Sequence, residues 1–435
     1  MDLDKLFHQI LKPALGCTEP VAVALASAAA TRAAAGWLPQ QTESAGHTAT
    51  PATAVHVVMS RSVFKNGFAI ALPNAEGHKG LHMAAALGHA CDPGKKLRLF
   101  EDVQPADIRA AEAMVQGGQV HVEVVEDVPE VYIRAEAECG AHRGAALIRG
   151  EHAHIACLWR DGQIVYGSIE DTPLSGDLGP IDTLKPLSFA EVVALIQNLP
   201  APVIDLLRTT VAKNIDACES GLERPMGVGA GYFSNAENIV QHISSLTAAG
   251  SDARMSGLPV EIMTSAGSGN QGVTATIPIV AYARAHQLDE GKMLEAVALS
   301  HLVTMYLTCY LGYLSALCGV AIKAGTGAAC GLTYLMGGGT PEIERAVKIM
   351  AATLTGVICD GAKAGCALKV STATDMALRA ATLAMKEAEV PRDNGIIGGT
   401  ADETIRHLAA LNRSMGKLDE TIVEIMLNKA SQVSN

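Results

Sequence analysis

Aromatic side chains and clustered basic residues are scarce in this chain. Phe, Trp and Tyr make up 4% of 435 residues, and the formal net charge is -12 at pH 7. Because nucleic-acid binding requires a concentration of lysine and arginine, we expect no nucleic-acid partner. Hydrophobic residues reach 49%, mostly small or aliphatic, and 42 glycines accompany them. This composition predicts a globular protein with a large core and closely packed helices.

The chain also lacks a secretory signal and a disulfide pattern. Its first residues, MDLDKLFHQILKPALGCTEP, have no basic start, no long apolar centre and no small-residue cleavage site. Ten cysteines in a chain of this length are too sparse for a disulfide scaffold, and a reducing compartment keeps them as thiols. We therefore expect a cytoplasmic protein in which most cysteines are small buried hydrophobes.

One uncharged stretch, residues 302–322, is long enough to span a membrane. Hydroxyl side chains interrupt it, Gly312 and Gly319 weaken it, and no comparable second stretch pairs with it. We interpret it as a buried helix of a soluble protein and expect no membrane partner. A transporter built around this stretch is the alternative.

The order of patterns along the chain is that of an α+β protein. Residues 2–36 are predicted to be helical and to stop at Gly36. Within them, Thr18, Glu19 and Pro20 are a good helix start, which leaves Cys17 at the electropositive mouth of a helix. We expect an N-terminal helical segment (1–45), an α+β domain with a β-sheet (46–172) and a mostly helical domain (188–435). A Pro-, Gly-, Asp- and Ser-rich linker, 171–188, precedes the last.

Alternating apolar residues predict the strands of the central domain. Residues 55–59 and 68–72 alternate on either side of Lys65-Asn66-Gly67, which indicates a β-hairpin with its turn at these residues. Residues 120–124 and 131–135 predict two more strands, and residues 155–166 a second hairpin with its turn at Asp161-Gly162.

A polar loop at residues 264–272, TSAGSGNQG, directly precedes an apolar run. Its small residues let the backbone fold around a ligand, and its amides, hydroxyls and carboxamides can converge on an anion. A substrate carboxylate suits it, with Ser265, Ser268, Asn270 and Gln271 as the contacts. A plain loop with a helix N-cap explains the pattern equally well, and the Gly-Lys-Ser/Thr ending of a phosphate loop is absent.

The cysteines offer a second chemical pattern. Cys359 and Cys366 flank a glycine-containing loop, and Cys318 can add a third thiolate. Three thiolates on a four-iron cluster leave one iron open as a Lewis acid. Ferredoxin-like spacing is absent, and buried core cysteines near glycines explain the pattern as well. Cys17 can act as a base, as a ligand or as neither. Lys65 and Asn66 become substrate contacts only if their turn faces the cluster.

Together these motifs resemble the iron-sulfur L-cysteine desulfidases, which are similar to the alpha chain of bacterial iron-sulfur L-serine dehydratases. The resemblance covers nearly the whole chain and is carried by LGCTEP (15–20), VFKNG (63–67), AGSGNQG (266–272), LSALCGV (314–320), GVICDGAKAGCALKV (356–370) and NGIIGG (394–399). It implies a [4Fe-4S] cluster bound by Cys318, Cys359 and Cys366 in a catalytic domain at 188–435. Cys17 then occupies the position of a proton-abstracting base or a displaceable fourth ligand.

The resemblance implies a lyase that eliminates hydrogen sulfide from L-cysteine to leave pyruvate and ammonia. L-serine is the alternative substrate, but the dehydratases separate their last two ligand cysteines more widely than Cys359 and Cys366. A non-enzymatic iron-sulfur redox or sensor protein is the alternative outside enzymes. We expect a small amino-acid substrate and a homodimer.

Overall fold

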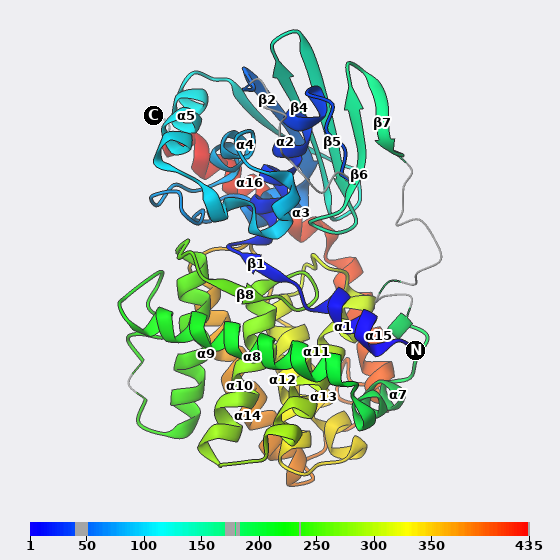
Figure 1. Ribbon diagram of the computed structural model, residues 1–435. Coiled ribbons are helices and arrows are strands. Elements are labelled where there is room, and N and C mark those ends of the chain that lie inside the picture. Colours follow the sequence, from blue (N-terminus) through cyan, green and yellow to red (C-terminus); the bar gives the residue numbers. More distant parts are fainter. Residues whose placement is uncertain (40–50, 170–178, 180–182, 235, 434–435) are drawn as a thin grey trace.

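The computed structural model describes residues 1–39, 51–169, 179, 183–234 and 236–433. A sheet module and a helical module stack one on the other, with the short strands β1 (Pro13–Leu15) and β8 (Glu261–Met263) between them (Figure 1). The predicted α+β class is confirmed. The predicted boundary at 45–46 and most of the predicted linker lie outside the described residues.

The sheet module is built on a six-stranded sheet with the order β3-β2-β4-β5-β6-β7. β2 and β3 are parallel and the other neighbours antiparallel. Helices α2 and α4 pack on one face, and α5 lies against α4 (Figure 1). The strands are β2 (Ala54–Ser60), β3 (Val120–Val125), β4 (Tyr132–Cys139), β5 (His142–Arg149), β6 (Ile155–Arg160) and β7 (Gln163–Gly167), and the helices are α2 (Thr18–Ala34), α3 (Arg61–Gly67), α4 (Leu81–Gly88), the 3₁₀ segment Pro93–Asp102 and α5 (Pro105–Gln116).

The predicted strands at 55–59, 120–124 and 131–135 and the hairpin at Asp161-Gly162 are confirmed. The predicted hairpin at Lys65-Asn66-Gly67 is wrong, because these residues end helix α3. Ser60 caps this helix by accepting a hydrogen bond from the backbone N–H of Val63 at 3.3 Å. A local cap therefore decides the structure where alternation indicated a strand. The alternation of apolar residues also failed to predict strand β5, because its Gly and Ala residues have low strand propensity.

The predicted helix start at Thr18 is confirmed, but the prediction that residues 2–36 are helical is wrong for residues 11–17. Helix α1 (Leu3–Ile10) ends before Pro13, and residues 13–15 form β1, which pairs antiparallel with β8. Pro13 has no N–H to continue a helix, and Gly16 turns the chain into α2 with a φ of 80°.

The helical module packs around a core in which α10, α11 and α12 are almost completely buried. Only α11, among the described helices, is by itself long and apolar enough to cross a membrane, and 89% of its most apolar window is buried. That burial is typical of a core helix. The helices are α7 (Phe189–Ala194), the 3₁₀ turn Leu195–Asn198, α8 (Ala201–Leu222), α9 (Ile239–Met255), α10 (Gly269–Ala285), α11 (Glu290–Leu311), a π-helical turn (Val320–Ala324), α12 (Gly325–Leu335), α13 (Thr340–Leu354), α14 (Cys366–Met385) and α15 (Ala401–Ser414).

The uncharged stretch 302–322 is not one helix. Helix α11 stops at Leu311, Gly312 adopts a φ of 83°, and residues 312–319 form a loop before the π-helical turn. The glycine is the physical reason, since a φ in this range is strained for other residues. This break places Cys318 in a loop.

The last helix, α16 (Gly416–Val433), returns to the sheet module and packs against α3 (Figure 1). Lys65 Nζ lies 2.7 Å from Asp419 Oδ1, and Arg61 lies 3.1 Å from Glu420. The chain thus crosses between the modules again after α15.

Glycine allows the closest contact between α2 and the sheet. A Cβ placed on Gly144 in β5 would lie 2.0 Å from the backbone oxygen of Ala30. We expect Gly144→Ala to lower the free energy of unfolding by about 1–3 kcal/mol, because a backbone clash cannot be relieved by a rotamer change. Urea unfolding followed by circular dichroism measures the effect. Gly416→Ala is the control, since a Cβ there meets nothing within 4 Å; equal midpoints for the two variants would contradict the prediction.

Candidate active site

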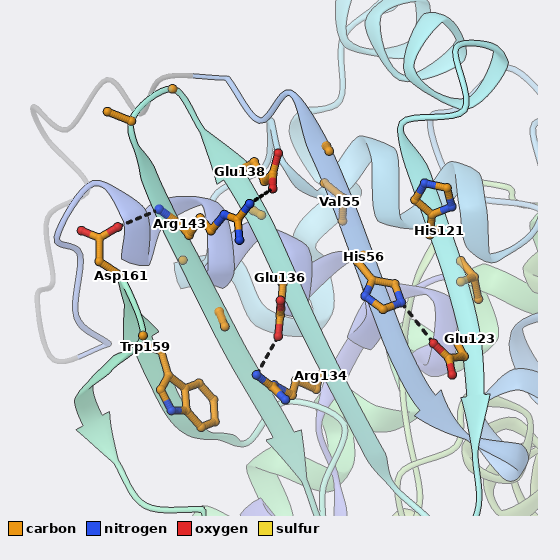
Figure 2. Close-up of a pocket in the computed structure, with 18 residues that line it drawn as sticks. Val55, His56, His121, Glu123, Arg134, Glu136, Glu138, Arg143, Trp159 and Asp161 are labelled. Atoms are coloured by element: carbon orange, nitrogen blue, oxygen red, sulfur yellow. Dashed lines mark hydrogen bonds and ion pairs between the residues drawn. The ribbon is translucent and has the colours of Figure 1, made fainter.

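A groove of about 1290 Å³ lies on the open face of the sheet. Figure 2 shows its charged side chains paired with one another across β3, β2, β4 and β5. The pairs are His56 with Glu123 at 3.3 Å, Arg134 with Glu136 at 2.6 Å and Arg143 with Glu138 at 2.6 Å. It contains none of the predicted site residues, and its charges already have partners.

A smaller cavity, about 80 Å³, lies between the two modules. Eight of the ten residues predicted for the site line it: Cys17, Asn66, Ser268, Asn270, Gln271, Cys318, Cys359 and Cys366. They come from α2, α3, the start of α10, the loop after α11 and the segment between α13 and α14. Residues distant in sequence therefore converge on one cavity, which we take as the candidate active site.

The three cysteines predicted to bind iron sit on two loop segments that hydrogen-bond to each other. The backbone N–H of Cys318 donates to the oxygen of Val357 at 2.8 Å, and that of Cys359 donates to Ala316 at 2.7 Å. These bonds form an antiparallel bridge between Leu317 and Ile358. Cys366 is the first residue of α14. The backbone of each loop is thus fixed next to its thiol.

Burial favours the neutral thiol at Cys318 and Cys366. It raises the pKa of Cys318 to about 11, with a further rise from the neighbouring Cys359, and Lys369 acts in the opposite direction. Burial also raises the pKa of Cys366, while Lys363 lowers it less. A metal that binds these sulfurs must displace protons, and the lysines offset part of the resulting negative charge.

The donor set fits a thiolate-bound cluster better than a single ion. All ten cysteines are free thiols. Within the described residues, no group of three His, Cys, Asp or Glu side chains is close enough to hold one metal ion. Cys318, Cys359 and Cys366 nevertheless line the same cavity. Soft sulfur donors spread around a cavity match the needs of an iron-sulfur cluster, whose irons are each bound separately.

Cys17 is the N-cap residue of α2, as the sequence predicts, but its thiol is not acidic. Its Sγ donates a hydrogen bond to Glu19 Oε2 at 3.0 Å. Burial, reinforced by the Glu19 carboxylate, raises the pKa of Cys17 well above its ordinary value, although Arg254 lowers it. The N-terminus of a helix favours a thiolate, but burial and the Glu19 carboxylate act on Cys17 in the opposite direction.

The polar loop contributes three of its four predicted residues to the cavity. Ser268 caps α10 by accepting a hydrogen bond from the N–H of Gln271 at 3.5 Å. Asn270 Oδ1 accepts from Arg254 at 3.1 Å. Ser265 lies outside the lining and is fully buried, with its hydroxyl 2.9 Å from His301 Nδ1. Ser265 therefore supports the loop from behind.

Only one of the two neighbouring residues Lys65 and Asn66 lines the cavity. Asn66 lines the cavity, and its Oδ1 lies 3.7 Å from Cys359 Sγ. Lys65 is outside the lining and forms the ion pair with Asp419. Its backbone oxygen would lie 2.3 Å from a Cβ on Gly361, so α3 contacts the cysteine loop closely.

Among the lining residues that sequence reasoning missed are Arg254 and His152. Arg254 lies near the end of α9, and His152 on the turn between β5 and β6. His152 Nε2 is 3.8 Å from Glu19 Oε1, and burial lowers the pKa of His152. Neither residue belongs to a motif, so the sequence offers no local signal for them.

The fold and this cavity define a protein with a thiol-rich site between a sheet module and a helical module. A family model described as serine dehydratase alpha chain matches residues 130–424. A UPF0597 protein of Desulfatibacillum aliphaticivorans is 35% identical, covering 96% of this chain and 96% of the relative. Another, of Alkaliphilus metalliredigens, is 36% identical, covering 95% of this chain and 92% of the relative. The chain belongs to the serine dehydratase alpha chain family.

The environment of Cys17 predicts its reactivity in metal-free protein. We expect the rate of alkylation at Cys17 to rise with pH to a midpoint above 9, because burial and Glu19 favour the neutral thiol. Glu19→Gln should move the midpoint to lower pH by removing a nearby negative charge. Peptide mass spectrometry isolates Cys17 from the other cysteines, and Glu76→Gln, at an exposed carboxylate, is the control. A midpoint below 9 in the unmodified protein would contradict the prediction.

Proposed function

We propose that the protein is an iron-sulfur-dependent carbon-sulfur lyase that degrades L-cysteine to pyruvate, ammonia and hydrogen sulfide. The observation that carries the proposal is the convergence of three thiols, Cys17 and the polar loop on one cavity. Membership in the serine dehydratase alpha chain family supports β-elimination from a small amino acid. The same membership makes L-serine the second candidate substrate.

The cofactor we propose is a [4Fe-4S] cluster held by Cys318, Cys359 and Cys366. When bound, such a cluster with three thiolate ligands supplies an open iron that acts as a Lewis acid on the β-substituent. The protein's own groups must then orient the substrate and remove its Cα proton.

Cys17 and Glu19 are suited to proton transfer. Their Sγ and Oε2 atoms are 3.0 Å apart, so the carboxylate can accept the thiol proton and leave a thiolate to take the Cα proton. Loss of the Cα proton and cleavage of the Cβ–S bond yield 2-aminoacrylate and hydrogen sulfide. The former tautomerises and hydrolyses to pyruvate and ammonia.

We expect the polar groups that line the same cavity as the cysteines to orient the substrate. Ser268, Asn270 and Gln271 begin α10 and line the cavity together with Asn66. Orientation of this kind contributes strongly to rate, because it removes the entropic cost of aligning the reacting bonds. Localisation in the cytoplasm and a homodimer remain predictions of the sequence, and sedimentation velocity tests the latter.

Anaerobic assays on both amino acids test the proposed reaction. We expect protein reconstituted with iron and sulfide to release pyruvate and sulfide in equal amounts from L-cysteine, with lower kcat/KM for pyruvate release from L-serine. Coupled detection of pyruvate and colorimetric detection of sulfide measure both products. Higher kcat/KM with L-serine would establish the second candidate, and no pyruvate from either substrate would reject both.

The ligand assignment predicts a selective loss of iron. Cys318→Ala, Cys359→Ala and Cys366→Ala should each lower bound iron and abolish activity, because an unligated iron is labile. Cys139→Ala is the control, since this cysteine is buried in β4 away from the cavity. Iron analysis and visible absorption after anaerobic reconstitution provide the measurement. Full iron content in Cys359→Ala would overturn the assignment.

A further inference from the structure

Arg254 brings a positive charge into the cavity, and its guanidinium forms no ion pair with a described carboxylate. Its side chain lines the cavity and the residue is 3% exposed. Nη1 donates to Asn270 Oδ1 at 3.1 Å, but Nε is buried with no hydrogen-bond partner. Across the described part of the chain, no Asp or Glu forms an ion pair with Arg254. The guanidinium is therefore held in place by a neutral amide. The Glu19 carboxylate lines the same cavity but already accepts hydrogen bonds from Cys17 at 3.0 Å and from Thr18 at 3.1 Å.

Arginine cannot escape this situation by losing its proton. A guanidinium keeps its charge in proteins, and a buried charge without an ion-pair partner is unfavourable. The nearest acidic residue along α9, Asp252, accepts hydrogen bonds from the N–H groups of Val228 at 3.2 Å and Gly231 at 3.0 Å. An anion that enters the cavity would offset the cost of burying Arg254.

Helix α10 begins with a glycine, which leaves room for the guanidinium of Arg254. A Cβ on Gly269 would lie 2.3 Å from Arg254 Nε, so glycine is required where the two meet. A second buried polar atom without a partner, Gln271 Oε1, lines the same cavity. The unsatisfied Nε donor of Arg254 matches the carboxylate of an α-amino acid, and the unsatisfied Oε1 acceptor of Gln271 matches its ammonium group.

We propose that Arg254 binds the substrate's α-carboxylate and restricts the site to amino acids whose carboxylate is free. Asn270 is then a positioning residue that acts through Arg254, since its Oδ1 already accepts from the guanidinium. Gln271 Oε1 accepts from the ammonium group. The proposal rests on the proposed function for the reaction that follows binding, but the binding itself is separable from turnover.

L-Alanine and L-alaninamide separate the carboxylate from the rest of the ligand. Neither carries a β-leaving group, so binding to the anaerobic holoenzyme is measured by calorimetry without turnover. We expect L-alanine to bind the unmodified protein at least tenfold more tightly than its amide. Equal affinities for the two probes would overturn the proposal on the unmodified protein alone, whatever the behaviour of any variant.

Substitution of Arg254 tests the residue itself. Arg254→Gln should weaken L-alanine binding by roughly tenfold to a hundredfold, as expected for a lost charge-assisted pair, and leave L-alaninamide binding nearly unchanged. Arg254→Lys should recover part of the loss, and Asn270→Ala should raise KM more than it lowers kcat. Iron content and melting temperature identify any variant that fails to fold. An equal loss for both probes would assign Arg254 a structural role. If neither L-cysteine nor L-serine yields pyruvate while the two probes remain distinguished, the proposed reaction fails and the carboxylate subsite stands.

Discussion

The antiparallel ladder between β1 and β8 fixes the relation of the two modules, and the site depends on that relation. Thr18, the first residue of α2, follows β1 by three positions, and Gly269, the first residue of α10, follows β8 by six. Thr264 N–H extends the contact by donating to the oxygen of Lys12 at 2.8 Å. Lys12 in turn forms an ion pair with Glu151 of the sheet module at 2.6 Å. Cys17 and the polar loop therefore reach the same cavity by short, constrained connections.

Small residues make this arrangement sterically feasible. A Cβ on Gly272 would lie 2.0 Å from the oxygen of Met263, and one on Gly16 would lie 2.4 Å from Pro73. Both glycines sit where a backbone segment must pass close to another on its way to the cavity. The scarcity of aromatics and the abundance of glycine thus have a direct structural use, because bulky side chains would separate the segments that carry the functional groups.

Burial sets the charge state of the cavity. The thiols of Cys17, Cys318 and Cys366 are neutral in the free protein because desolvation raises their pKa values. The guanidinium of Arg254 lies in the same cavity without an ion pair to any described carboxylate. The cavity thus combines a guanidinium with thiols that can become thiolates. Both favour the entry of groups that bring negative charge or displace protons.

The sequence alone is enough to predict the α+β class, the strands at 120–124 and 131–135, the hairpin at Asp161-Gly162 and the helix start at Thr18, because these depend on local periodicity, turns and caps. Its motifs also indicated most of the cavity-lining residues. Only the tertiary structure decided that residues 13–15 form a strand, that Lys65 pairs with Asp419, and that Arg254 lies without a carboxylate beside Asn270. These facts arise from contacts between segments far apart in the chain. Burial, which sets the pKa of Cys17 and isolates the charge of Arg254, exists only once those segments have packed.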